Sequence, residues 1–400
     1  MSIAGSVLVL NAGSSSLKYQ LIHPDTEVVS AEGLCERIGD LGSSITHEQN
    51  GAELTEEIEL PDHRTAFERV AELFAEGGID LDTAGLRAVG HRVVHGGRTF
   101  FLPTLIDEHV MSEIERIAGL APLHNPANLI GIRAAGQLLP DVPAVAVFDT
   151  AFFHGLPDAA ATYALDRGVA SLHAIRRYGF HGTSHEYVSG KAAEFLGKPL
   201  SELNQIVLHL GNGASASAIR GGQPIDTSMG MTPLQGLVMG TRSGDIDPGV
   251  VMHLHRVAKL SADQIDTLLN KQSGLKGLCG ESDFRSVTAL IEQGDHSAKL
   301  AYDVYVHRLR HYLGAYLLDL GRLDAICFTA GVGENAAGLR ADTLTDLENF
   351  GIILDPERNS VRSKETRRIS TDGSAVDVLV VPTNEELAIA RQAAQVVADS

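Results

Sequence analysis

The sequence has few cysteines, and they form no metal-binding pattern. Cys35, Cys279 and Cys327 are scattered along the chain, without a C-x-x-C pair. An odd number leaves one thiol outside any disulfide scheme, so we expect reduced cysteines, as is typical of a cytoplasmic protein.

A long apolar run and an excess of positive charge are also missing. No apolar stretch approaches the ~20 residues of a membrane helix, and the first residues lack the basic segment of a signal peptide. The chain of 400 residues has 32 Lys and Arg against 51 Asp and Glu, a formal net charge of −19. Because such a field repels phosphate backbones, we expect no nucleic-acid partner, and the missing apolar run argues against a membrane partner.

Several catalytic motifs are absent as well. There is no GxxxxGK[ST] of a P-loop NTPase, no GxSxG nucleophile elbow and no HExxH zinc motif. The pairs His91/His95 and His181/His185 have the i,i+4 spacing of helical zinc ligands. The first pair falls in an expected strand and the second begins before a helix, which disfavours a transition-metal site.

What is present is a strand–turn–strand pattern that occurs twice. Residues 6–10 are apolar, residues 11–16 are small or polar, and residues 17–22 alternate between apolar and polar. Residues 206–219 repeat this design around the turn 211–213. The repeat predicts two related domains, and a chance resemblance of two hairpins is the alternative.

Further apolar runs at 144–148 and 326–329 indicate more strands, the first ending on Asp149. Start and stop signals predict four helices. They cover residues 126–139, the segment from a capping box of Thr183 and Glu186 to Gly197, about 297–320, and 387–397 behind a second box of Thr383 and Glu386. This order of strands and helices predicts an α/β protein.

The glycine-rich segment 211–216, GNGASA, has the spacing of the dinucleotide fingerprint. That fingerprint needs a helix after the turn, whereas the alternation here indicates a strand. The two hairpin turns could instead hold a polyphosphate through backbone N–H groups, with Lys18 as a point charge. An ordinary exposed lysine is the other interpretation of Lys18.

Hard oxygen ligands stand at three expected ends of elements. Asn11, Asp149 and Glu385 could hold Mg²⁺, which needs only one or two carboxylates when phosphates and water complete its shell. Each could equally be a structural cap.

Two arginines and one histidine stand in places where an anion could bind. Arg92 lies in the strand-like run 89–97, where a charge needs a partner or a ligand. Arg242 lies in the polar loop 239–248 and suits a carboxylate or a phosphoryl group, unless it pairs with a nearby aspartate. His181 precedes a helix N-terminus, where an imidazole can donate to developing negative charge or simply pack in a turn.

Together these motifs resemble those of the acetate kinase family. VLVLNAGSSSLK at 7–18 is similar to the family's N-terminal signature, and RYGFHGTSH at 177–185 is similar to its second. The resemblance continues at 209–213, 239–248, 331–335 and 382–386.

The resemblance implies an α/β fold with two duplicated actin-like (ribonuclease H-like) domains around a nucleotide cleft. Residues 1–150 with a returning 386–400 would form the first domain, and 151–385 the second, with the nucleotide site. The implied reaction is reversible, direct in-line transfer of the ATP γ-phosphoryl to acetate, giving acetyl phosphate and ADP. It would require Mg²⁺, with Mn²⁺ as an alternative, in a cytoplasmic homodimer.

The resemblance also implies a role for each matching residue. Asn11 and Glu385 would bind the metal, and the catalytic residues would be Asp149, His181 and Arg242. Arg92 would bind the substrate carboxylate, in an acyl pocket walled by Val94, Leu123, Phe180 and Pro233. The nucleotide would be bound by Lys18, His209, Leu210, Gly211, Asn212, Gly213, Asp283, Phe284, Arg285, Gly331, Val332, Gly333, Glu334 and Asn335.

Two alternatives remain at this stage. A non-enzymatic actin-like nucleotide-binding module would share the phosphate turns without the two arginines and His181. A propionate or butyrate kinase would differ in pocket volume alone, and one methylene is worth only ~1–3 kcal/mol of discrimination.

Overall fold

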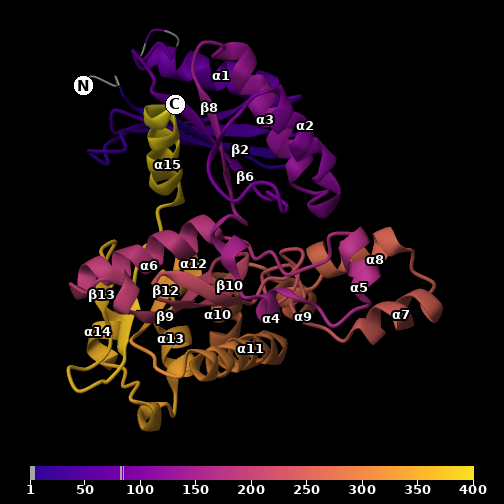
Figure 1. Ribbon diagram of the computed structural model, residues 1–400, viewed down its shortest axis with the longest axis vertical. Helices are drawn as coiled ribbons and strands as arrows, with labels where there is room; N and C mark the ends of the chain where they lie inside the picture. Colours follow the sequence, from indigo (N-terminus) through magenta and orange to yellow (C-terminus); the bar gives the residue numbers. More distant parts are fainter. Residues whose placement is uncertain (1–4, 82, 84) are drawn as a thin grey trace. The chain divides into compact units, whose positions relative to one another are not determined.

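The protein, described here by a computed structural model for residues 5–81, 83 and 85–400, forms two compact units (Figure 1). The first unit comprises Met1–His154 and Asn384–Ser400, and the second comprises Gly155–Thr383. The final helix therefore belongs to the same unit as the first strands.

The first unit is built on an eight-stranded sheet with the order β5-β4-β3-β2-β1-β6-β8-β7. Its strands are β1 (Val7–Ala12), β2 (Ser16–Ile22), β3 (Val29–Glu36), β4 (Ser44–Gln49), β5 (Ala52–Glu57), β6 (Ala88–Val93), β7 (Thr104–Leu105) and β8 (Ala144–Phe148). Its helices are α1 (His63–Glu76), α2 (Glu108–Arg116), α3 (Asn125–Leu138) and α15 (Glu385–Asp399), with short 3₁₀ turns at Ala118–Leu120 and Phe152–Gly155. The apolar runs predicted as strands at 6–10 and 144–148 become β1 and β8, each flanked by strands on both sides and buried as an inner strand requires.

The second unit contains a six-stranded sheet with the order β11-β10-β9-β12-β14-β13. Its strands are β9 (Asn204–Leu210), β10 (Ala214–Arg220), β11 (Gln223–Thr227), β12 (Ala325–Thr329), β13 (Arg367–Arg368) and β14 (Asp377–Val380). Its helices are α4 (Asp158–Ala161), α5 (Arg167–Leu172), α6 (Gly182–Leu196), α7 (Pro248–Arg256), α8 (Ala262–Lys271), α9 (Gly274–Cys279), α10 (Phe284–Glu292), α11 (His296–Leu320), α12 (Ala330–Asn335), α13 (Ala337–Leu344) and α14 (Pro356–Ser360), with 3₁₀ turns at Leu200–Glu202 and Glu348–Phe350.

The two sheets share one topology. In the first, β1 runs antiparallel to β2, β2 antiparallel to β3, β1 parallel to β6, and β6 parallel to β8. In the second, β9, β10, β11, β12 and β14 repeat these pairings in the same order and directions. Since ligands of α/β sheets bind beyond the carboxyl ends of parallel strands, the ends of β1, β6, β8, β9 and β12 are where a site is expected.

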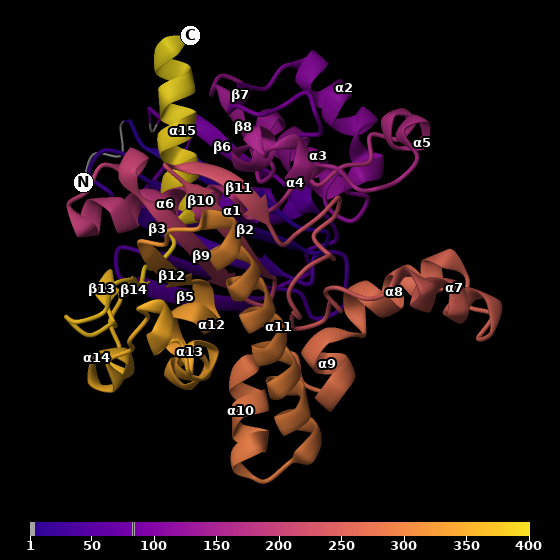
Figure 2. The ribbon, with the colours of Figure 1, turned by 60° about the horizontal axis from the view of Figure 1, so that its bottom comes forward.

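Helices cover the sheets of both units. In the first unit α15 packs on β1, β6 and β8, while α1 packs against α3. In the second unit α6 lies on one side of the sheet and α11 on the other (Figure 1). Helices α10 and α11 pack side by side (Figure 2).

Two helix starts differ from the sequence prediction. Helix α6 begins at Gly182 after His181, whose backbone is left-handed (φ 58°, ψ 28°), so Thr183 is inside the helix and caps nothing. Helix α15 begins at Glu385, and its cap is the side chain of Asn384, which accepts from the N–H of Leu387 at 2.9 Å. In both places a residue immediately before the helix, rather than the threonine, turns the chain.

The other helix predictions are confirmed. Helix α3 covers the predicted segment, α6 ends at a left-handed Gly197 (φ 63°), and α11 ends before Gly321. The three cysteines carry free thiols. None of the helices in the described ranges is both long and apolar enough to cross a bilayer.

Candidate active site

In the first unit, side chains from three adjacent parallel strands meet at Arg92. Its Nε donates to Oδ1 of Asp149 at 2.9 Å, its Nη2 donates to Oδ2 at 2.5 Å, and its Nη1 donates to Oδ1 of Asn11 at 3.3 Å. Asp149 is 2% exposed. Burial acts to lower the pKa of Arg92, but the charges of Asp149, Glu385 and Glu386 outweigh it and raise that pKa. Arg92 therefore stays charged beside the ends of β1, β6 and β8.

The predicted phosphate-binding lysine has a partner in this unit. Lys18, on β2 opposite Asn11, forms an ion pair with Glu386 in the first turn of α15. Its neighbour Glu385 is less free to ionise, because burial, together with the charges of Asp149 and Glu386, raises its pKa to about 7. Lys18 must leave this carboxylate before it can bind a phosphate.

The oxygen donors predicted to hold a metal suit Mg²⁺. Asn11 supplies an amide oxygen, and Glu385 supplies a carboxylate whose ionised form is disfavoured by burial and by neighbouring carboxylates. A hard divalent cation would stabilise that ionised form, and with phosphate oxygens it needs few protein ligands. In the described ranges no group of three or more His, Cys, Asp and Glu side chains is arranged to hold a metal ion.

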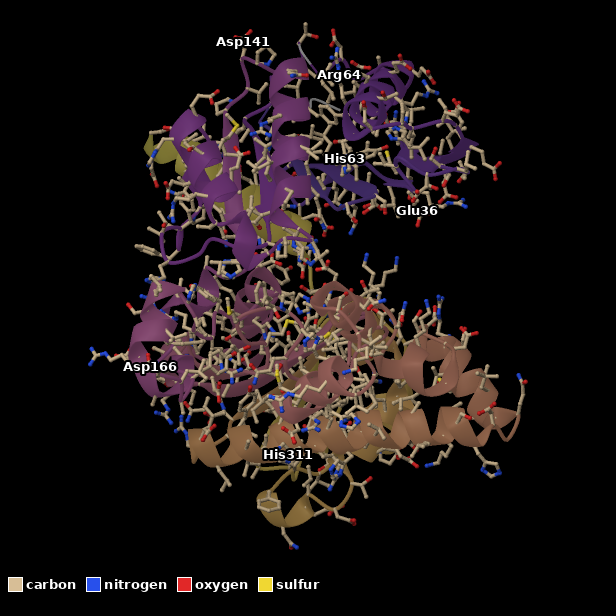
Figure 3. All side chains as sticks on the ribbon, turned by 90° about the vertical axis from the view of Figure 1, so that its right-hand side faces the viewer. Glu36, His63, Arg64, Asp141, Asp166 and His311 are labelled. Carbon is tan, nitrogen blue, oxygen red and sulfur yellow. The ribbon has the colours of Figure 1, made fainter. Side chains whose placement is uncertain are left out.

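The turn between β1 and β2 is held from two sides. The N–H of Gly13 donates to the carbonyl of Ser16 at 2.8 Å, and Nε2 of His63 at the start of α1, labelled in Figure 3, donates to the carbonyl of Gly13 at 2.7 Å. A Cβ on Gly13 would lie 2.7 Å from Oγ of Ser16, so the tightness of this turn requires glycine.

In the second unit, His181 and Arg242 meet at the β9–β10 turn. The rings of His181 and His209 stack with centroids 4.3 Å apart. A Cβ built on Gly213 would lie 3.4 Å from Nε2 of His181 and 3.6 Å from Nη1 of Arg242, so both side chains lie against this glycine. Nη1 of Arg242 also donates to the carbonyl of Pro233 at 3.1 Å. The predicted catalytic pair thus lies beside a predicted phosphate turn.

A cavity of about 1,150 Å³ opens in the second unit. Three of the segments that line it, 211–212, 283–285 and 331–335, carry nine of the residues predicted to bind nucleotide. These are Gly211, Asn212, Asp283, Phe284, Arg285, Gly331, Val332, Glu334 and Asn335. Of the rest of that group, His209 and Gly213 lie at the turn described above, whereas Leu210 and Gly333 are buried beneath it.

Two carboxylates that line this cavity have hydrogen-bond partners. Nη2 of Arg285 donates to Oδ2 of Asp283 at 2.6 Å, and these hydrogen bonds lower the pKa of Asp283 to about 2. Glu334 accepts from the N–H of Thr383 at 3.3 Å, and burial raises its pKa.

The four predicted acyl-pocket residues divide between the units. Val94 and Leu123 belong to the first, where Val94 is buried and Leu123 is 41% exposed. Phe180 and Pro233 belong to the second, next to His181 and Arg242 respectively. Their joint role as a pocket stays a prediction.

Some residues at these sites were not predicted from the sequence. Gly240 and Arg340 line the cavity, and Glu386 pairs with Lys18. Arg340 is buried, donates to the carbonyls of Gly333 and Glu334 at 2.8 and 3.0 Å, and so supports the glycine-rich segment from behind. Nothing in the helical pattern around Arg340 marks it as different from a surface arginine.

Two sheets of one topology, each with a tight small-residue turn after its first strand, place the protein in the actin-like class of kinase folds. The chain belongs to the acetokinase family, whose model matches residues 6–391. The acetate kinase of Leifsonia xyli subsp. xyli is 59% identical over 393 residues, which cover 98% of this chain and 99% of that protein.

Solved structures agree with this assignment. The crystal structure of Porphyromonas gingivalis acetate kinase matches with a TM-score of 0.92 and 43% identity, over 98% of this chain and 100% of the other. That of a propionate kinase from Francisella tularensis subsp. tularensis matches with a TM-score of 0.92 and 42% identity, over 97% and 98%. The prediction of family and fold from sequence motifs is confirmed.

Proposed function

We propose that this protein is an acetate kinase, which transfers the γ-phosphoryl group of ATP to acetate in a reversible reaction that gives acetyl phosphate and ADP. The observation that carries the proposal is the turn 211–213. Asn212 lines the large cavity, while Gly213 lies against His181 and Arg242. One turn thereby joins a nucleotide-sized cavity to two groups suited to a phosphoryl group in transfer.

The chemistry needs charge neutralisation more than a base. A carboxylate is ionised at neutral pH and already nucleophilic, so the barrier lies in bringing two anions together. Arg92 would bind the acetate carboxylate, Arg242 the phosphoryl group, and His181 would donate to its developing charge. A loose, in-line transition state is stabilised by such positioned donors.

Four further residues complete the proposed roles. Asn11 and Glu385 would hold Mg²⁺, which supplies positive charge to the ATP phosphates when it is bound, and Mn²⁺ would be an alternative. Lys18 would exchange Glu386 for a phosphate oxygen. Asp149 orients Arg92 through both of its carboxylate oxygens and so aligns the nucleophile.

The finer assignments extend the same proposal. Residues 1–150 with 386–400, and 151–385, would be the two duplicated domains, supported by the common order of their sheets. The acyl chain would be measured by Val94, Leu123, Phe180 and Pro233. We propose a homodimer in the cytoplasm.

Propionate kinase activity is the second candidate, because a solved propionate kinase matches this chain as well as a solved acetate kinase does. Trapping of acyl phosphate with hydroxylamine across formate, acetate, propionate and butyrate separates the two. We expect the highest kcat/KM with acetate. A higher kcat/KM with propionate would instead identify a propionate kinase. If no acid gives an acyl hydroxamate, carboxylate kinase activity is refuted.

A further inference from the structure

A chain of buried hydroxyl and imidazole groups lies behind His181. Oγ of Ser215 lies 2.9 Å from Nδ1 of His181 and 2.7 Å from Nε2 of His185, and Oγ of Ser217 lies 2.7 Å from Nδ1 of His185. Ser215, Ser217 and His185 are fully buried. The order of the chain is Ser217, His185, Ser215, His181.

Two backbone periodicities bring these groups together. Ser215 and Ser217 are two residues apart on β10 and share one face of the strand. His185 on α6 is one helical turn after His181. Two residues of a strand advance by about 6–7 Å and one turn of a helix by about 5.4 Å. Because these lengths are similar, serines and histidines alternate along the chain of hydrogen bonds.

The hydroxyl protons can be arranged in two ways along this chain. If His181 donates from Nδ1 to Ser215, then Ser215 donates to Nε2 of His185, and Nδ1 of His185 donates to Ser217. The hydroxyl proton of Ser217 then has no acceptor, because its Oγ contacts only His185 in the hydrogen bonds of the described chain. A buried unsatisfied donor costs about 1–3 kcal/mol.

The opposite arrangement gives an acceptor to both serine hydroxyls and to the N–H of His185. Ser217 donates to Nδ1 of His185, Nε2 of His185 donates to Ser215, and Ser215 donates to Nδ1 of His181. His185 needs only one proton for this, and burial, together with the charge of His209, lowers its pKa well below the usual value. The proton of neutral His181 is then on Nε2, the atom that lies against Gly213 beside Arg242.

We propose that Ser215 and Ser217 are positioning residues, which act with His185 to hold His181 in the Nε2–H tautomer. Neutral His181 can then donate a hydrogen bond toward Gly213 and the reacting phosphoryl group without first taking up a proton. The left-handed backbone of His181 (φ 58°) adds a second constraint, since a non-glycine residue adopts it at a cost that the surroundings must offset. The catalytic consequence rests on the proposed function, but the tautomer itself does not.

Nitrogen-15 NMR of the full-length protein labelled in its histidines measures the tautomer directly. Long-range proton–nitrogen correlations distinguish Nε2–H from Nδ1–H, and the signals of His181 are assigned by their loss in His181→Gln. We expect Nε2–H in the wild type. A wild-type signal for neutral His181 protonated on Nδ1 would overturn the proposal.

Substitutions test whether the serines set this tautomer. We expect Ser215→Ala and Ser217→Ala each to introduce the Nδ1–H form and to reduce kcat by about 10- to 100-fold, the usual range for groups that orient a catalytic ligand, with KM little changed. Ser217→Thr keeps the hydroxyl and should restore both readouts. An unfolding midpoint near that of the wild type shows that a variant is folded. If Ser215→Ala does not fold, the test rests on Ser217→Ala.

The matched control is Ser189→Ala. Ser189 is a buried serine on α6 one turn after His185, and its hydroxyl has no hydrogen-bond partner in the described part of the chain. This variant should keep both the tautomer and kcat. If both chain serines can be removed without a change in the tautomer, the proposal is wrong, whatever happens to kcat. Absence of phosphoryl transfer in the wild type would instead refute the proposed function and leave the NMR result standing.

Discussion

Arg92 binds both carboxylate oxygens of Asp149 from the neighbouring parallel strand, at 2.9 and 2.5 Å. The backbone fixes this pairing, since the N–H of Asp149 donates to the carbonyl of Val93 at 3.0 Å. Planar two-point geometry is what a guanidinium gives and a lysine does not. The same contact therefore orients the arginine that is proposed to bind acetate, and its positive charge neutralises the charge of the buried Asp149 carboxylate.

A double-mutant cycle on this pair measures that balance. With Arg92→Leu and Asp149→Asn, we expect a coupling free energy of unfolding of about 1–3 kcal/mol, because either single change leaves a buried group without its partner. The control is the exposed pair Arg64 and Glu68 on α1, whose arginine is labelled in Figure 3. Its coupling should stay near 0.3–0.5 kcal/mol. Equal coupling in both pairs, measured by urea unfolding, would contradict this interpretation of Arg92.

Gly240→Ala should weaken nucleotide binding. A Cβ at Gly240 would lie 1.9 Å from Oδ1 of Asn212 and 3.0 Å from the carbonyl of Ser282, so the Asn212 side chain must move. Both residues line the large cavity. We expect KM for ATP to rise more than KM for acetate, with the fold kept. Gly190→Ala is the control, since a Cβ there has open space within 4 Å. An unchanged KM for ATP would show that this part of the cavity does not bind nucleotide.

The sequence predicted the first two strands of each sheet and the turn between them because their signals are local. The apolar run 7–10 followed by a small-residue turn, and the run 206–210 followed by Gly211, each specify a strand and its end without long-range information. The position of Asp149 after β8 followed from the same reasoning. Strong local patterns thus located the residues, and the family motifs supplied their expected roles.

What the sequence did not predict depends on contacts between distant segments. The partners Arg92 and Asp149 are 57 residues apart, and Lys18 and Glu386 are 368 apart. The buried Arg340 is held by Asn359, 19 residues further along the chain, to whose side-chain and main-chain oxygens it donates. The wrong cap at Thr183 has a similar origin, since the left-handed turn at His181 is set by its tertiary surroundings and not by the local S/T-x-x-E pattern.

Acid should destabilise the first unit through His91. This side chain is buried, its Nε2 has no hydrogen-bond partner in the described residues, and burial lowers its pKa to about 3. Below pH 6.5 the unfolded chain takes up a proton that the folded chain does not. The free energy of unfolding therefore falls as pH falls, by up to about 1.4 kcal/mol per pH unit from this residue until its folded pKa is reached.

Urea unfolding at several pH values tests this effect. A range of about pH 4 to 7 brackets the ordinary histidine pKa of about 6.5. His91→Gln should reduce the loss of stability on acidification, even if it lowers stability at neutral pH. His311→Gln, at an exposed histidine on α11 labelled in Figure 3, should leave the slope as it is. An unaltered slope in His91→Gln would show that His91 is not a source of the acid sensitivity.

Arg242→Ala should reduce kcat far more than it alters either KM. The guanidinium lies beside Gly213 and His181, and Pro233 fixes one of its nitrogens. An arginine that stabilises charge present only in the transition state contributes little to substrate binding in the ground state. Its loss therefore lowers kcat and kcat/KM together. Arginines of this kind in phosphoryl transfer are worth about 10³-fold or more in kcat.

Arg242→Lys separates charge from geometry. A lysine ammonium keeps the positive charge but lacks the planar fork that donates at once to Pro233 and to a phosphoryl oxygen, so we expect it to recover only a small part of kcat. Arg322→Ala, which removes an exposed arginine paired with Asp324, is the matched control and should leave both constants unchanged. Steady-state kinetics with acetate and ATP varied in turn provide the measurement. Near-normal turnover in Arg242→Ala would show that this guanidinium does not stabilise the transition state, and would contradict its proposed role.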